Sequence, residues 1–139
     1  PSSAASDVYK RQNDNTALGF QALYVNTTGT MNVGIGNSAL GANTTASNNT
    51  AIGSYAMFVN TTGYHNVAIG NYALDANTTT HSNTALGYSA LSSNTANGNV
   101  AVGKNALYTN TTGGANADLW FTLDGEWNLS RIAFHIPRG

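Results

Sequence analysis

Apolar and polar residues recur along this chain in a pattern that repeats about every 17 positions. Each copy opens with an Asn, and successive copies begin 17, 17, 17, 17, 16 and 17 residues apart, the seventh copy being degenerate. The opening residues are Asn15, Asn32, Asn49, Asn66, Asn83, Asn99 and Asn116. A fixed period of this length is typical of a solenoid, in which each repeat forms one coil and packs its apolar side chains against its neighbours.

The first segment of each copy alternates in character, and this alternation predicts a strand. After the Asn come Thr or Val, then Ala or Gly, then Leu, Ile or Val, and then a Gly that all six copies share. Short alternating runs with β-branched residues favour strands, and a Gly in every copy disfavours a helix. The shared glycines are Gly19, Gly36, Gly53, Gly70, Gly87 and Gly103.

The second half of each copy predicts a second strand and a closing turn. It begins with Ala followed by Leu or Met, as in Ala73-Leu74, and after two variable positions it reaches Asn-Thr. Three residues after that Asn comes a position that is Gly in half of the copies, which indicates the turn that closes a coil. The turn position aligns Gly29, Ala46, Gly63, Thr80, Asn97 and Gly113.

We therefore expect an all-β fold, a parallel β-roll or β-solenoid of about six 17-residue coils over residues 15–114. We expect about two large apolar side chains per coil to form the core. The small residues at the third position would then face outward and allow another chain to approach closely, so we predict a homo-oligomer, most simply a trimer. These residues are Ala17, Gly34, Ala51, Ala68, Ala85 and Ala101.

The two flanks do not follow the repeat. Residues 1–14 are interpreted as a disordered N-terminal segment or a sequencing scar, because residues 7–12 resemble the translation of a transposase adapter. In residues 115–139, two runs of alternating apolar residues at 119–123 and 126–132 enclose Asp124-Gly125. This pattern predicts a β-hairpin with a type I′ turn, which caps the end of the roll or begins the next domain.

Charge narrows the range of partners. Only 8% of the chain is charged and its net charge is −1, and within residues 15–114 the charged side chains are Asp75 and Lys104. A neutral surface cannot displace counterions from phosphates or attract anionic lipid, so we expect neither nucleic-acid binding nor direct membrane insertion. Cysteine is absent and no apolar run reaches membrane-spanning length, so we expect any export signal to lie outside this sequence.

The sequence contains no complete catalytic motif. Residues 98–104 imitate the start of a phosphate-binding loop, but Asn105 stands where the motif needs Ser or Thr. The histidines lack the spacing of metal ligands and are interpreted as solvated, two of them in turns; they are His65, His81 and His135. We therefore expect a non-enzymatic protein without a metal or cofactor.

The Asn-Thr pair is the strongest candidate for a functional surface. Identical Asn side chains stacked about 4.8 Å apart can form a hydrogen-bonded ladder, and this internal role is the preferred interpretation. The alternative is a regular hydroxyl array that binds glycan or ice, with ranks beginning at Asn26 and Thr28 and interrupted at Ala96. The Asn file is Asn26, Asn43, Asn60, Asn77, Asn94 and Asn110, and the Thr file is Thr27, Thr44, Thr61, Thr78, Thr95 and Thr111.

Two stretches carry a resemblance to a known family. Residues 66–73 (Asn-Val-Ala-Ile-Gly-x-x-Ala) and 99–106 (Asn-Val-Ala-Val-Gly-x-x-Ala) resemble the head repeats of trimeric autotransporter adhesins of the YadA type. The resemblance covers residues 15–114 and implies a left-handed parallel β-roll assembled as a homotrimer. Similar Asn-Thr-Ala-x-Gly arrays also resemble bacterial and phage tail-fibre-like proteins.

From these observations we hypothesise an extracellular repeat head or shaft of a trimeric surface adhesin or phage tail fibre. Such a protein would stand on a bacterial cell surface, anchored to the outer membrane through other regions, or on a virion. It would attach to a host-cell surface, a matrix protein or a glycan receptor. The alternatives are an ice-binding β-solenoid that uses the Asn and Thr files, and a purely structural spacer.

Overall fold

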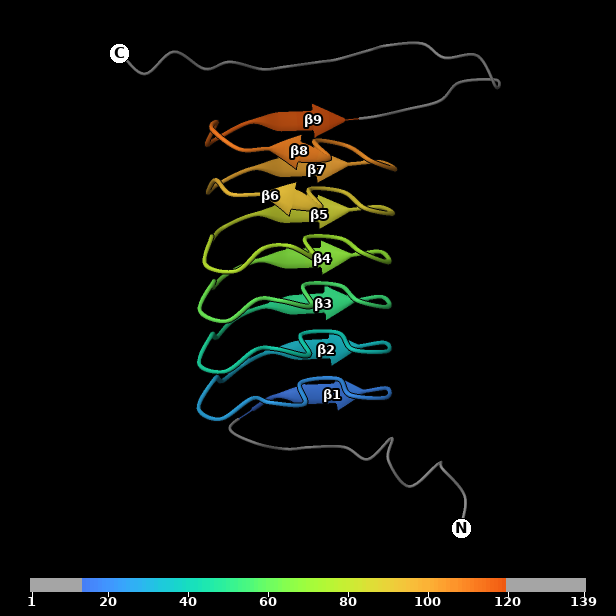
Figure 1. The fold of residues 1–139 in the computed structure, drawn as a ribbon, viewed down its shortest axis with the longest axis vertical. Helices are drawn as coiled ribbons and strands as arrows, with labels where there is room; N and C mark the ends of the chain where they lie inside the picture. Colours follow the sequence, from blue (N-terminus) through green and yellow to red (C-terminus); the bar gives the residue numbers. More distant parts are fainter. Residues whose placement is uncertain (1–13, 120–139) are drawn as a thin grey trace.

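A computed structural model describes residues 14–119, which form one column of stacked coils (Figure 1). The described residues contain short strands and turns and no helix. The strands are β1 (Thr16–Leu18), β2 (Val33–Ile35), β3 (Thr50–Ile52), β4 (Val67–Ile69), β5 (Thr84–Leu86), β6 (Ser93–Asn94), β7 (Val100–Val102), β8 (Thr109–Asn110) and β9 (Ala117–Leu119).

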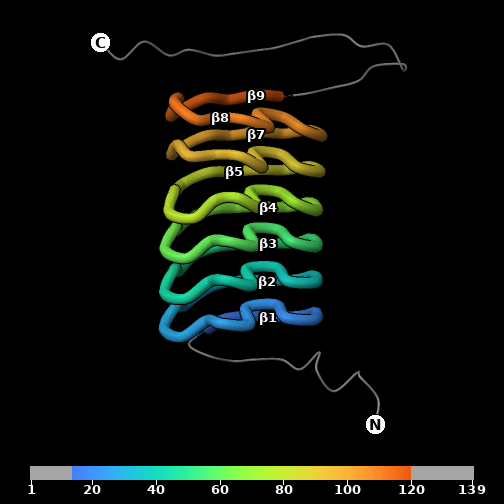
Figure 2. Tube along the Cα trace, viewed as in Figure 1, coloured from blue at the N-terminus to red at the C-terminus, as the bar shows by residue number. Residues whose placement is uncertain are grey.

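Seven of these strands form one parallel sheet in the order β1-β2-β3-β4-β5-β7-β9. Pairing is in register with the repeat, so that Thr50 lies opposite Val67 and Ile52 lies opposite Ile69. The tube in Figure 2 shows each coil lying over the one before it. The predicted β-solenoid with a 17-residue period is confirmed, and the degenerate seventh Asn immediately precedes β9.

The predicted second strand forms in only two coils. β6 and β8 pair in parallel through Ser93 with Thr109 and Asn94 with Asn110, whereas the other coils have turns there. In every coil the large apolar residue takes a left-handed backbone with φ of 45–51°, so the predicted strand cannot run through the Ala-Leu pair, and β6 and β8 begin two residues after it. A residue in that conformation breaks the extended backbone, and the chain bends instead of continuing as a strand. These residues are Leu23, Leu40, Met57, Leu74, Leu91 and Leu107.

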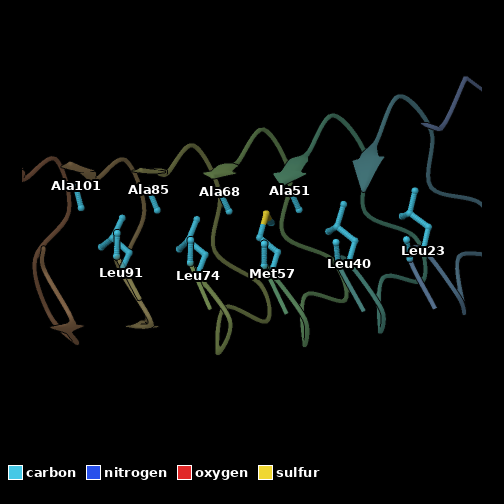
Figure 3. Packing of buried hydrophobic residues seen from close by; sticks show 14 of the residues in the cluster. Leu23, Leu40, Ala51, Met57, Ala68, Leu74, Ala85, Leu91 and Ala101 are labelled. Atoms are coloured by element: carbon cyan, nitrogen blue, oxygen red, sulfur yellow. The ribbon is translucent and has the colours of Figure 1, made fainter. Parts of the chain in front are cut away.

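The core is narrower than predicted, and its small residues point inward. In each of the first five coils one Leu or Met is buried against Ala side chains, and Figure 3 shows these residues in a single file facing Ala51, Ala68, Ala85 and Ala101. The prediction that the third-position residues face another chain is therefore wrong. At Gly34 an added Cβ would lie 3.3 Å from Cγ of Leu23 and 3.2 Å from the carbonyl oxygen of Ala39. The coil interior has room for one large side chain and not for two.

The shared glycines are required by both conformation and space. Their φ values lie between 122° and 137°, a region that side chains with a Cβ rarely adopt. A Cβ on any of the first five would lie 2.4–2.7 Å from the carbonyl oxygen of the shared glycine in the next coil. Stacked coils approach too closely at this corner for any other residue.

The opening asparagines form a buried ladder through the roll. From the second coil on, the backbone N–H of each opening Asn donates to Oδ1 of the opening Asn in the preceding coil, at 2.8–3.0 Å. In the first four coils Nδ2 donates across the coil to the turn carbonyl 14 residues later, at 2.7–2.8 Å. Each amide therefore satisfies one backbone group in its own coil and one in the next, in a part of the protein that water does not reach.

The Asn of the Asn-Thr pair forms a second ladder, as predicted. Nδ2 of Asn43 donates to Oδ1 of Asn26, and the pattern continues through Asn60 and Asn77 at 2.8–3.2 Å. These amides also donate to the turn carbonyl that the first ladder uses, so two side chains converge on one oxygen in each coil. Between Asn77 and Asn94 the hydroxyl of Thr80 bridges the two, because it donates to Oδ1 of Asn77 and accepts from Nδ2 of Asn94.

Compared with the other coils, the single 16-residue coil lacks one residue between the Asn of the Asn-Thr pair and the turn carbonyl. The turn carbonyl that accepts from Asn94 and Asn99 belongs to Ala96, two residues after Asn94 instead of three. The alignment of Asn97 with the turn glycines is therefore wrong by one position. Because Ala96 takes the turn place, both ladders continue across the deletion.

Asp118 occupies the core position that is Ala or Gly in the other coils. Elsewhere the backbone N–H of the large apolar residue donates to an Ala carbonyl of the next coil, as from Leu91 to Ala106 at 3.0 Å. In the last described coil the N–H of Leu107 donates instead to Oδ2 of Asp118 at 3.0 Å. The carboxylate thus replaces the carbonyl of a further coil. Its other oxygen, Oδ1, is buried without a hydrogen-bond partner within residues 14–119.

The N-terminal segment, apart from Asp14, and the predicted hairpin at 119–132, apart from Leu119, lie outside the described residues.

We expect Asn66→Ala to lower the free energy of unfolding by about 2–4 kcal/mol, because it leaves the N–H of Asn83 without its acceptor and removes a donor to the carbonyl of Thr80. Urea unfolding at fixed protein concentration measures this change. The control is Asn71→Ala, which removes an exposed bond to the N–H of Ser54 and should cost less than about 0.5 kcal/mol. Equal losses in the two variants would contradict the role of the ladder.

We expect Gly70→Ala to destabilise the roll by more than about 2 kcal/mol, because the new methyl group meets the carbonyl of Gly87 at a backbone conformation that is itself strained for Ala. The matched variant is Gly98→Asn. Gly98 has φ of 71° and no heavy atom within 3.7 Å of its added Cβ, and Asn tolerates this left-handed conformation. Thermal unfolding of both variants should show a large decrease in Tm for the first and a small change for the second.

Candidate functional site

The predicted Thr file lies at the surface, and most of its hydroxyl groups donate hydrogen bonds to backbone carbonyls of the next coil. Oγ1 of Thr27 donates to the carbonyl oxygen of Thr44 at 2.9 Å, and Thr44 and Thr61 each donate to the next Thr in the file at 3.3 and 3.1 Å. Thr95 donates to Thr111 at 2.9 Å. The side chain of Thr78 is exposed. The file therefore extends the hydrogen bonding between coils, and its geometry is explained without a ligand.

The proposed ranks of Asn26 and Thr28 do not form a shared surface. The Asn file turns into the roll, where Asn43, Asn60 and Asn77 are fully buried, while the Thr28 position stays exposed. An array of paired Asn and Thr side chains is therefore not presented to solvent.

The histidines and the loop-like motif do not come together as a site. The ring of His81 stacks on Tyr64 with centroids 4.7 Å apart, and His65 packs edge-on against the same ring; His135 lies outside the described residues. β7 occupies the middle of residues 98–104, so these residues do not form a phosphate-binding loop. Across residues 14–119 no three His, Asp or Glu side chains are close enough to hold a metal ion.

A shallow hollow of about 520 Å³ lies beside the 16-residue coil, where His81, Asn97 and Gly98 contribute to its lining. The hollow follows from the deletion, because that coil is one residue shorter than its neighbours. Oδ1 of Asn97 accepts a hydrogen bond from the backbone N–H of His81 at 2.9 Å, and this bond links the turns of two successive coils.

The outward side of the parallel sheet carries a continuous aliphatic surface. Because the small middle residue of each strand points inward, the first and third residues point outward, and strand pairing places them directly above one another. We call this surface the aliphatic face; it consists of Leu18, Val33, Ile35, Ile52, Val67, Ile69, Leu86, Val100 and Val102. Leu18, Ile69 and Leu86 are 54%, 37% and 43% exposed.

The aliphatic face is uncharged and regular. Thr16, Thr50 and Thr84 alternate with valines along its second-position file, and β1–β5 and β7 contain no charged residue. A contiguous apolar surface of this kind is typical of an interaction site. The alternation of large and small residues in the sequence indicated this surface. However, the sequence-based prediction placed the large residues in the core and the small residues outside, which is the reverse of the structure.

A second surface, absent from the sequence-based candidates, is a row of aromatic rings. Tyr55 stacks on Tyr72 with centroids 5.5 Å apart and planes inclined by 4°. Phe58 packs edge-on against Tyr55 at 5.3 Å, Tyr88 packs edge-on against Tyr72 at 6.0 Å, and Nζ of Lys104 lies 5.9 Å from the centre of the Tyr88 ring. We call these rings the aromatic row. Tyr55, Tyr72 and Tyr88 belong to the turns that follow β3, β4 and β5, at the arrowhead ends of the strands in Figure 1.

The aromatic row continues into a groove at the N-terminal end of the roll. Tyr24 and Phe58 contribute to this groove, which has a volume of about 270 Å³ and also includes Gln21 and Gly41 in its lining. A Cβ on Gly41 would lie 3.0 Å from a carbon of the Phe58 ring, so the glycine makes room for the ring to lie over the backbone. A sequence signal existed, since aromatic residues recur just after the shared Gly and just after the buried Leu or Met.

Within the part of the chain that the structure describes, no helix could span a lipid bilayer. No family model, curated protein or solved structure matches this chain.

Proposed function

We propose that this chain is the head or shaft of an extracellular homotrimeric fibre, a surface adhesin or a phage tail fibre, that attaches to a host cell or matrix. The observation that carries the proposal is the aliphatic face, an exposed and uncharged apolar surface that runs the length of the column. Sister chains that lie side by side along the column axis would bury it.

The regular stacking supports parallel association of the chains. Because equivalent residues repeat in every coil, a rotation axis parallel to the column gives each coil of one chain the same contacts with its sister chains. Burial of apolar surface contributes about 25 cal/mol per Å², and the gain grows with each coil. The number three comes from the resemblance to trimeric adhesin heads.

The composition fits a projecting fibre. Only Asp14, Asp75, Lys104 and Asp118 carry formal charge in residues 14–119, and amide and hydroxyl groups provide most of the polar surface. A solenoid lengthens by adding coils, and several chains displayed together turn weak contacts into strong attachment.

One observation favours ice binding as a second candidate. The two outward positions of each strand lie two residues apart and are stacked in register over six coils, which gives two parallel ranks on one face. In this alternative the Thr and Val rank beside the aliphatic rank would face ice in place of sister chains. Thermal hysteresis in a solution of the purified protein would favour it over attachment.

We expect the protein to be a trimer in solution and the pair Ile52→Glu with Ile69→Glu to convert it into a monomer, because burying two added carboxylates at each chain's contact is unfavourable. Light scattering coupled to size-exclusion chromatography measures the mass, and circular dichroism checks that the fold is kept. The control pair, Thr62→Glu with Thr79→Glu, adds the same charges in the same two coils on exposed turns and should remain trimeric. A wild-type monomer, or a trimer that survives the first pair, would contradict the proposed interface.

We expect the trimer to bind one or more surfaces in a panel coated with glycans or extracellular-matrix proteins. The monomeric pair should bind the same surface about 10²- to 10⁴-fold more weakly, since avidity is lost. The control pair should match the wild type. Equal binding per chain by monomer and trimer would argue against attachment through multiple sites.

A further inference from the structure

The exposure of the aromatic row is not explained by the stability of the coil. In the described part of the chain, the core consists of Leu, Met and Ala side chains and contains no aromatic ring. In the row Tyr72 and Tyr88 are 39% and 50% exposed, and in the adjoining groove Tyr24 is 63% exposed. Tyr55 and Tyr72 occupy a position that is Ser38 in the second coil, with nearly the same φ of 56–59°. The same turn therefore forms without a ring, and its backbone conformation does not require the tyrosines.

The geometry of the row fits a ligand that lies along the column. Tyr55, Tyr72 and Tyr88 come from three successive coils, and their centroids are separated by 5.5 and 6.0 Å. Tyr55 and Tyr72 stack on each other and Tyr88 is inclined by 73° to Tyr72, so the three rings form a continuous aromatic strip along the column. Sugar rings present flat C–H faces that pack on aromatic rings, while their hydroxyl groups need polar partners at the edges of the site.

Polar groups suited to hydroxyl groups flank the row. Asn71 lies next to Tyr72 and is exposed; its Oδ1 accepts from the N–H of Ser54 at 2.9 Å, and its Nδ2 is a further donor. Gln21 contributes an exposed amide to the groove beside Tyr24. Asp75 accepts a hydrogen bond from Oγ of Ser92 at 2.6 Å and retains further acceptor capacity.

Charge decides between the two classes of polymer that stack on aromatic rows. Proteins that bind single-stranded nucleic acid combine stacking rings with a positively charged groove that follows the phosphates. Here Lys104, at one end of the row, is the single cationic Lys or Arg side chain in residues 14–119. A neutral surface of rings, amides and hydroxyls is complementary to an uncharged, hydroxyl-rich chain.

We infer that the aromatic row and its adjoining groove form a binding site for an extended, uncharged glycan that lies parallel to the column axis. The exposed parts of Tyr72 and Tyr88 pack against C–H groups of the sugars along the row, and the groove between Tyr24 and Phe58 holds a further sugar over Gly41. The inference rests on the proposed attachment function and deepens it by naming the class of receptor. It assigns that role to residues separate from the aliphatic face.

The test uses the full chain and four probes: hexasaccharides of glucose, galactose and N-acetylglucosamine, and single-stranded DNA of matched length. Titration calorimetry and tyrosine fluorescence should detect at least one hexasaccharide and no DNA. Tyr72→Ala should weaken that binding about tenfold or more, because it removes the central ring of the row, which contacts both Tyr55 and Tyr88. Tyr72→Trp should keep it.

The matched control is Tyr64→Ala, which removes an exposed ring outside the aromatic row, the one stacked on His81. It should leave hexasaccharide binding within about twofold of the wild type, and circular dichroism should show the same fold for all variants. Failure of all three sugars to bind, binding of DNA alone, or equal affinity of wild type and Tyr72→Ala would overturn the inference.

The outcomes also separate this inference from the proposed fibre. A monomeric protein whose hexasaccharide binding depends on Tyr72 would support the glycan site and contradict the trimer. A trimer that binds no hexasaccharide would overturn the glycan site alone.

Discussion

The hydrogen bonds of the buried asparagine side chains hold successive coils in register. A side-chain amide has the same donor and acceptor as a peptide group, so a stack of asparagines can bond both upward and across the coil. The chain of bonds from Asn15 to Asn116 requires the same residue at the same place in every coil. One residue lost between Asn94 and Ala96 is tolerated because the turn carbonyl still reaches both ladders.

A thin core follows from this arrangement. The two asparagine files and the turn occupy one end of each coil, and the glycine corner with its close backbone contacts occupies the other. Between them there is space for one Leu or Met and two small residues, which are both Ala except for Gly34 in the second coil. The larger aliphatic residues of the strands therefore point outward and form a contiguous apolar surface, which is typical of an interaction site. The outward position of the aliphatic face thus follows from the dimensions of the coil.

The repeat divides its positions between two tasks. Positions that stack identical residues, such as the shared Gly and the two asparagines, satisfy backbone groups or allow close approach between coils. Some positions that differ between coils carry exposed aromatic side chains, as where the chain places Tyr72 in one coil and the buried Ser38 at the same position in another. Because the scaffold does not depend on these variable positions, their side chains can change without loss of the fold, and the candidate binding surface lies among them.

Much of this architecture was determined by the sequence alone. The 17-residue spacing of Asn and Gly predicted parallel coils in register, and the repeated Asn-Thr pair predicted a ladder through Asn43 and Asn60, because identical residues at a fixed period can only stack on themselves. Only the tertiary structure decided which side of the strand faces the core. The alternation in Val67-Ala68-Ile69 is compatible with either side, and the narrow width of the coil excludes the larger side chains from the core. It also decided that Leu74 bends the chain, through a backbone conformation that residue type does not reveal. The aromatic row became visible for the same reason: Tyr55, Tyr72 and Tyr88 lie 16 or 17 residues apart in the chain, and stacking of the coils brings their rings within 6.0 Å.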